Sequence, residues 1–201
     1  MKKVLLITLG LLCHMALASA QNEASVFLDW RIDYTVSLYD KPGGEIQRRL
    51  CIDDTNFEDS MLMMTIFDMN DSMYKVAIGC HPLYIDTGWI SKSAPLRVDD
   101  RLYSDEARLE VFRSPNGKTP IVTVAYAAVE DHLQVVEASL HNRGFKSRIK
   151  EGTAFFDGPF EVVDVNLHNG WLKIRFKVCT TTIEGWIAPG SYCGNPYTDC
   201  C

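Results

Sequence analysis

Apolar and polar residues alternate along several short stretches of the chain. Every second position is apolar in residues 34–39, 74–78 and 171–178. Because successive side chains of a β-strand point to opposite faces, this period of two predicts strands with one buried face. Gly, Pro, Asn and Asp bound the stretches, and Asn116-Gly117 and Asn169-Gly170 are typical of tight hairpin turns. The pattern predicts an all-β sandwich or barrel.

Two further segments have a less regular pattern. Residues 125–140 place Val129, Leu133 and Val136 near helical spacing, yet their flanking polar residues also suit a strand. We favour strands over a helix here. The Met-rich run at residues 61–66 is interpreted as a buried strand, with an adaptable contact surface as the alternative.

Three ordered sequence blocks occur twice, which indicates a duplication. A strand ending in a hydrophobe-aromatic pair precedes a Pro-containing turn, a Val/Phe-Asp-x-Asn block follows, and a Gly-Trp-Ile block ends each copy. We expect a first domain at residues 21–98 and a second at 108–201. The second is longer, mostly near residues 125–160, where an inserted hairpin, a helix and a degenerate third repeat remain open. The blocks are Val36–Gly44, Phe67–Asn70 and Gly88–Ile90 in the first copy, and Leu109–Gly117, Val163–Asn166 and Gly185–Ile187 in the second.

The second copy resembles bacterial SH3-type domains, which are small β-barrels of exported bacterial proteins. The resemblance rests on residues 169–174, on Glu184–Ile187 and on the cysteine-containing tail at 192–200, and it is weaker in the first copy, where Met73-Tyr74 replaces Gly-Trp. It implies two tandem SH3-like barrels, the second with an insertion. It also implies non-catalytic binding of cell-wall peptidoglycan or an envelope protein through aromatic residues. The candidate ligand-binding residues are Tyr39, Tyr84, Phe112, Tyr192 and Tyr197.

Trp89 and Trp186 belong to the Gly-Trp blocks. An indole ring is large enough to fill much of the interior of a small barrel, and its burial contributes a few kcal/mol. We therefore favour core packing over ligand contact for both tryptophans.

The first residues predict export. Residues 1–20 have the basic, apolar and small-residue order of a secretory signal peptide, and no later stretch reaches membrane-spanning length. We expect a secreted or periplasmic protein that is not transmembrane after cleavage. Cleavage of residues 1–20 would remove Cys13 and leave six cysteines. An even number of cysteines in an exported chain is normally interpreted as a set of disulfides. We favour Cys51 with Cys80, Cys193 with Cys200 or Cys201, and Cys179 with the remaining terminal cysteine.

Charge and motifs argue against several function classes. The net charge is -6, and without a Lys/Arg cluster the chain is a poor nucleic-acid binder. No nucleophile motif, Walker loop, dinucleotide fingerprint or zinc motif occurs. Residues 68–71 mildly resemble a calcium loop, but a turn explains them better. We therefore expect no enzyme, cofactor or metal. An exported inhibitor or immunity-type protein that blocks an enzyme is the alternative function, and the ligand and oligomeric state stay open.

Overall fold

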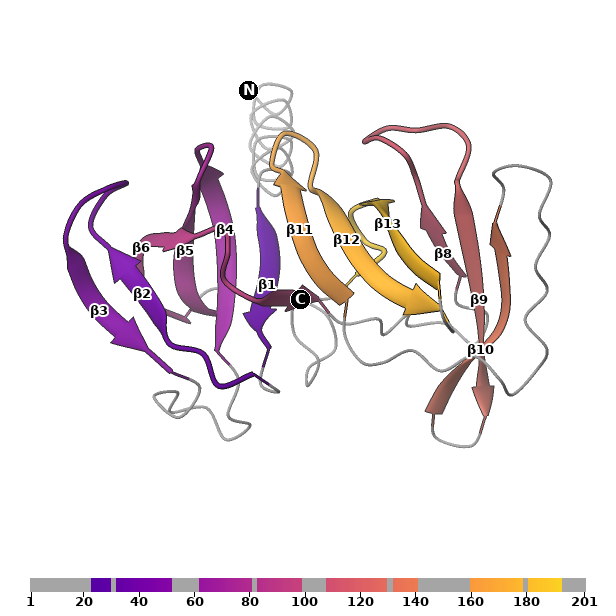
Figure 1. Cartoon of the computed structure of the whole chain (residues 1–201), viewed down its shortest axis with the longest axis horizontal. Helices are drawn as coiled ribbons and strands as arrows, with labels where there is room; N and C mark the ends of the chain where they lie inside the picture. Colours follow the sequence, from indigo (N-terminus) through magenta and orange to yellow (C-terminus); the bar gives the residue numbers. More distant parts are fainter. Residues whose placement is uncertain are drawn as a thin grey trace, which may run out of the picture.

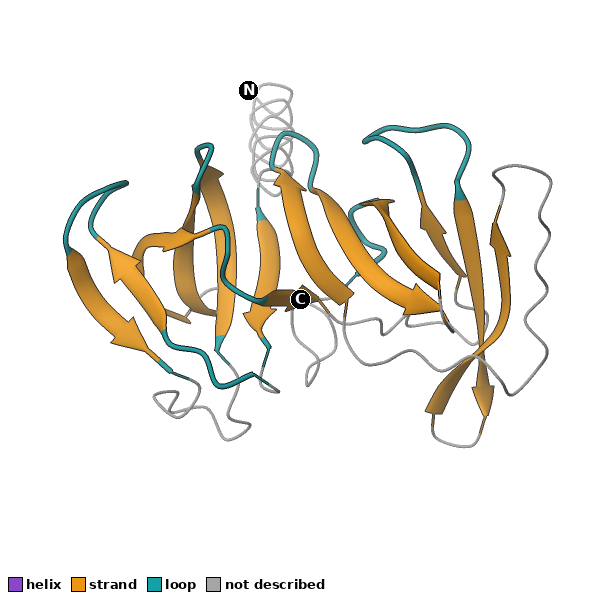
Figure 2. Ribbon diagram, viewed as in Figure 1, coloured by secondary structure: helices purple, strands orange, loops and turns teal. Residues whose placement is uncertain are grey.

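The computed structural model describes residues 23–29, 32–51, 62–80, 83–98, 108–129, 132–140, 160–178 and 181–192. All regular elements within these ranges are β-strands (Figure 2), so the all-β prediction is confirmed. The strands are β1 (Ala24–Leu28), β2 (Val36–Tyr39), β3 (Ile46–Leu50), β4 (Met63–Met69), β5 (Met73–Cys80), β6 (Leu83–Ser91), β7 (Leu96–Val98), β8 (Arg108–Val111), β9 (Val122–Val129), β10 (His132–Leu140), β11 (Phe160–Asn166), β12 (Trp171–Val178) and β13 (Thr181–Ile187).

Ten of these strands form one antiparallel sheet, in the order β13-β12-β11-β7-β1-β4-β5-β6-β2-β3. The other three form a sheet in the order β10-β9-β8. A β-bridge between Phe112 and Trp186 connects the end of β8 to β13. Figure 1 shows β4 to β6 on one side of β1, and β11 to β13 on the other. Below, residues 36–91 are called the first unit and residues 108–187 the second unit.

The described strands do not close into two separate barrels. Strand β7 pairs with β1 through Leu96 and Arg97, and with β11 through Arg97 and Val98. Both edges of β7 are therefore occupied, and the sheet runs from one unit into the other. The prediction of closed barrels is not met in these ranges, because one short strand is shared where each barrel would need its own.

The sequence blocks shared by the two units also share their strand pairing. A β-bulge follows Ile66 between β4 and β5, and a bulge follows Val162 between β11 and β12. In the first unit Lys75 lies opposite Trp89, and in the second Lys173 lies opposite Trp186. A bulge bends its strand and re-aims the next side chain. Both units therefore present the residue after the bulge in the same local geometry.

The glycine of each Gly-Trp pair lies where its strand crosses the opening strand of its unit. A Cβ atom added at Gly88 would lie 2.9 Å from the backbone oxygen of Tyr39. One added at Gly185 would lie 2.8 Å from the backbone oxygen of Phe112. Real Cβ atoms do not approach this closely, so a side chain here would push the strands apart. This close approach explains why glycine precedes tryptophan in both blocks.

The segments with irregular patterns form strands. Residues 122–129 and 132–140 pair as the β9–β10 hairpin, with a bulge between Val135 and Glu137. The preference for strands over a helix at 125–140 is confirmed for the described residues. In the Met-rich run, Leu62, Met64 and Ile66 are buried, which confirms a buried strand there.

A row of alternating charges crosses the sheet between the units. The buried carboxylate of Asp29, directly after β1, accepts a 2.7 Å hydrogen bond from Nε of Arg97. Arg97 and Arg175 both lie opposite Glu161, and Arg175 also lies opposite Glu184. The shortest contacts of Arg175 are 3.1 Å to Glu161 and 2.9 Å to Glu184. Opposite charges on facing strands stabilise a sheet, so this row ties β1 and β7 to the second unit.

Candidate functional site

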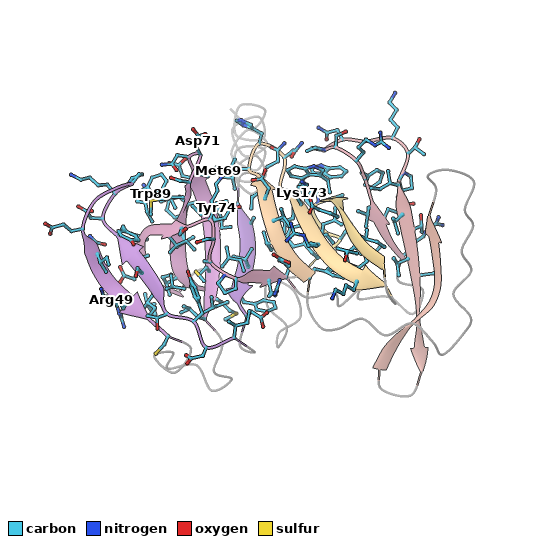
Figure 3. All side chains as sticks on the ribbon, in the orientation of Figure 1. Arg49, Met69, Asp71, Tyr74, Trp89 and Lys173 are labelled. Carbon is cyan, nitrogen blue, oxygen red and sulfur yellow. The ribbon has the colours of Figure 1, made fainter. Side chains whose placement is uncertain are left out.

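A partly open groove of about 600 Å³ lies where the β4–β5 and β11–β12 hairpins approach each other. We call it the junction groove. Both units contribute to it, through the end of β4, the end of β11 with its following turn, and one residue of β13. Figure 3 shows Met69 and Asp71 at the free end of the β4–β5 hairpin, and Lys173 on β12 beyond them. The lining residues are Phe67, Asp68, Met69, Asp164, Val165, Asn166, Leu167, His168 and Trp186.

Two carboxylates in the groove occupy matching positions in the two units. Asp68 and Asp164 each follow the β-bulge of their strand. Oδ1 of Asp68 accepts a 2.8 Å hydrogen bond from the N–H of Met69, and Oδ1 of Asp164 accepts one of 2.9 Å from Val165. A carboxylate oxygen has several lone pairs. Each side chain is thus held in place while the other oxygen remains an acceptor.

Trp186 forms an aromatic part of the wall. The backbone N–H of Trp186 donates to the backbone oxygen of Phe112 at 2.8 Å, and the backbone oxygen of Trp186 accepts from the backbone N–H of Phe112 at 2.7 Å. Trp186 and Trp89 are both half-buried rather than core residues. The preference for core packing is therefore not met, because both indoles lie on the sheet face that also carries Lys75 and Lys173.

The lysines around the groove are already engaged. Nζ of Lys92 lies 3.9 Å from Oδ1 of Asp164 and 5.0 Å from the centre of the Tyr74 ring. Nζ of Lys75 lies 5.3 Å from the centre of the Phe67 ring. Lys173 forms an ion pair with Glu184, and this contact is the first cause that holds the pKa of Glu184 below its ordinary value. Asp68 lies opposite Lys75 and Asp164 lies opposite Lys173, but the two ammonium groups contact Phe67 and Glu184 instead.

The hydroxyl of Tyr74 is buried beside this cluster. It has no hydrogen-bond partner within the described part of the chain, although the residue is only 1% exposed. Burial raises the pKa of Tyr74, and the charge of Asp164 raises it further. An unpaired buried hydroxyl destabilises a fold. The Tyr74 side chain thus lies buried beside the contact between Lys92 and Asp164.

Of the aromatic residues proposed from the sequence, the three whose side chains are described do not line the groove. Tyr39 is half-buried on β2, and the side chain of Tyr84 and all of Tyr197 lie outside the described residues. Phe112 is buried, and its ring meets that of Trp171 edge-on at 5.3 Å. The hydroxyl of Tyr192 donates to the backbone oxygen of Gly170 at 2.9 Å, and burial raises its pKa.

The cysteine pairing stays a prediction. Cys51 is half-buried directly after β3, and the backbone of Cys80 ends β5. The side chain of Cys80 and all of Cys179, Cys193, Cys200 and Cys201 lie outside the described residues.

The described lining of the groove consists mainly of acidic, aromatic and aliphatic side chains. Its lining contains no Ser or Cys nucleophile, and across the described ranges no three His, Cys, Asp or Glu side chains gather as a metal site would need. Asp68 is exposed, and the side chain of Asp164 is 44% exposed.

Comparisons with protein-family models, curated proteins and solved structures find no match to this chain. None of the described residues forms a helix with the length and apolar character of a membrane span.

The duplicated block contains a signal for the groove. Asp68 and Asp164 occur at the same place in the duplicated Asp-x-Asn block, and we interpreted the first of them only as a turn residue. Turn formation explains Asn70 and Asn166, whose side-chain oxygens accept hydrogen bonds from the following backbone. Asp68 and Asp164 likewise each accept a hydrogen bond from the backbone N–H of the next residue. The repetition of this acidic residue after both bulges is the feature of the sequence that marks the groove.

Proposed function

We propose that this chain is an exported, non-catalytic recognition protein that binds cell-wall peptidoglycan through the junction groove. The observation that carries the proposal is the lining of that groove, which combines the half-buried Trp186 with the carboxylates Asp68 and Asp164. Binding sites combine apolar walls with a few fixed polar groups, and a volume of about 600 Å³ lies in the usual range for a small ligand.

We further propose that the two units are SH3-like and arose by duplication. Each has an opening strand and a three-stranded meander, and the last strand of the meander carries the Gly-Trp pair and returns to the opening strand. An insertion of one residue in a strand, or the loss of a turn, would change which residues lie opposite each other in these strands. Their agreement between the units supports a common origin, and the cysteine-rich exported context supports a cell-envelope role.

The test is retention on insoluble peptidoglycan sacculi, with protein produced and exported from the full 201-residue sequence. Trp186→Ala should lower retention about tenfold or more, because an aromatic anchor at the centre of a site carries much of its binding energy. Trp89→Ala is the matched control, since Trp89 has the same register in the first unit but does not line the groove.

A parallel pull-down from solubilised envelope extract separates the alternatives. Retention on sacculi that depends on Trp186 supports the proposal. Specific capture of one envelope protein or enzyme, with no retention on sacculi, would replace it with a scaffold or inhibitor role.

A further inference from the structure

We infer that the junction groove recognises a primary ammonium group on an aliphatic stem. In peptidoglycan this group is the free side-chain amine of the diamino acid in the stem peptide, and the glycan has no equivalent. The inference rests on the proposed function and names the part of the wall that is bound.

The first unit already holds an ammonium group in the matching place. Lys75 lies opposite Trp89, with its Nζ 5.9 Å from the centre of the indole ring and 5.3 Å from that of Phe67. This is the distance range of a cation–π contact. In the first unit, a lysine of the chain itself thus makes the cation–π contact with the tryptophan.

The second unit differs at this point. Lys173 lies opposite Trp186, but its ammonium pairs with Glu184 instead. Within the described part of the chain no internal ammonium lies over the Trp186 ring, and that ring lines the groove. The ammonium group of a ligand would therefore lie over the Trp186 ring as the ammonium group of Lys75 lies over the Trp89 ring.

The charge of the groove favours the same ligand. Asp68 lies opposite Lys75, whose ammonium lies over the Phe67 ring, and the ion pair of Asp164 with Lys92 is long and partly exposed, at 3.9 Å. Exposed pairs of this kind contribute little energy. Two carboxylates with spare acceptor oxygens attract an ammonium and repel an anion.

The apolar lining suits the stem of such a ligand. Phe67, Met69 and Leu167 line the groove together with Trp186. Thioether and aromatic surfaces adapt to flexible aliphatic chains. A metal ion would need a third ligand, and no group of three such ligands occurs in the described ranges. An amine on a methylene chain uses both the acidic and the apolar parts of the groove.

The experiment compares intact sacculi with sacculi whose free amines have been acetylated, using protein from the full sequence. Calorimetric titration with a synthetic lysine-containing stem peptide and its Nε-acetyl form provides a second measurement. Asp68→Asn and Asp164→Asn should each weaken binding about tenfold or more, as expected for loss of a charged hydrogen-bond partner. Asp71→Asn is the matched control, because it removes the same charge from the same hairpin but does not line the groove.

Loss of binding on acetylation, with loss in both groove variants and none in the control, supports the inference. Equal binding to native and acetylated sacculi overturns it and leaves the wall-binding function standing. Binding to neither form of sacculi, and to neither peptide, removes the proposed function and this inference together. Thermal unfolding of each variant checks that the fold is retained.

Discussion

Replacement of Arg97 by alanine is the sharpest test of how the two units are joined. Arg97 lies in β7 and its side chain is 14% exposed, while the side chain of Asp29 is 1% exposed. Their 2.7 Å contact is a buried ion pair. Arg97→Ala leaves the Asp29 carboxylate buried without its guanidinium partner, because β1 and the residues around it hold the side chain away from water.

The expected loss is large for one substitution. Breaking a buried ion pair by removing one partner costs about 3–5 kcal/mol. For a chain of this size that corresponds to a fall in Tm of about 6–20 °C. It is also a large fraction of the roughly 5–15 kcal/mol that stabilises an ordinary domain.

Urea unfolding followed by circular dichroism gives the free energy of unfolding of each variant. Arg175→Ala is the matched control, since Arg175 lies in the same charged row but its side chain is 41% exposed. Its loss should stay below about 1 kcal/mol. The double variant Asp29→Leu, Arg97→Met should recover most of the stability, because it removes both charges. If Arg97→Ala costs no more than Arg175→Ala, the reasoning about this buried pair is refuted.

Three further predictions concern stability. Tyr74→Phe should stabilise the protein by about 1 kcal/mol or more, because it removes an unpaired buried hydroxyl. Tyr192→Phe should destabilise it by about 1 kcal/mol, because a hydrogen bond is lost. Equal shifts of the urea midpoint in the two variants would contradict this prediction. Gly185→Ala should lower the free energy of unfolding by about 1–3 kcal/mol or more, because the added Cβ would force β13 away from β8. Thr182→Ala on the same strand is the control and should have little effect. An unchanged Tm for Gly185→Ala would disprove the close approach of the two strands. Burial raises the pKa of both tyrosines in the folded state, so stability is present below the unfolded pKa of about 10 and falls as the pH rises above it. Urea midpoints measured across that pH range should fall less steeply in the Tyr74→Phe, Tyr192→Phe double variant, and an unchanged slope would argue against the shifts.

Local features of the fold could be predicted from sequence because their causes are local. The alternation at residues 34–39, 74–78 and 171–178 corresponds to β2, β5 and β12, since burial of one sheet face imposes a period of two. Gly170, in a predicted Asn-Gly turn, has a φ of 67°, which glycine adopts at little cost. These features need only a few neighbouring residues.

The features that depend on distant residues could not be predicted. The pairing of β7 with both β1 and β11 joins segments far apart in the chain, and no short motif encodes it. The groove depends on that arrangement, since it brings the ends of β4 and β11 to one place. Burial of Phe112 against Trp171 likewise follows from how β8 meets β13. An aromatic residue in a repeated block does not by itself reveal which side of the strand faces solvent.

The sharing of β7 has a practical consequence for dissecting this protein. The repeat in the sequence suggests dividing the protein between residues 98 and 108 into two fragments, each with one copy of the repeat. In the fold, that cut leaves β7 on the first fragment and exposes the edge of β11 that it covers. An uncovered edge strand readily pairs with another chain. A fragment beginning at residue 108 should therefore aggregate or dimerise through β11, whereas one beginning before Leu96 carries the missing strand with it.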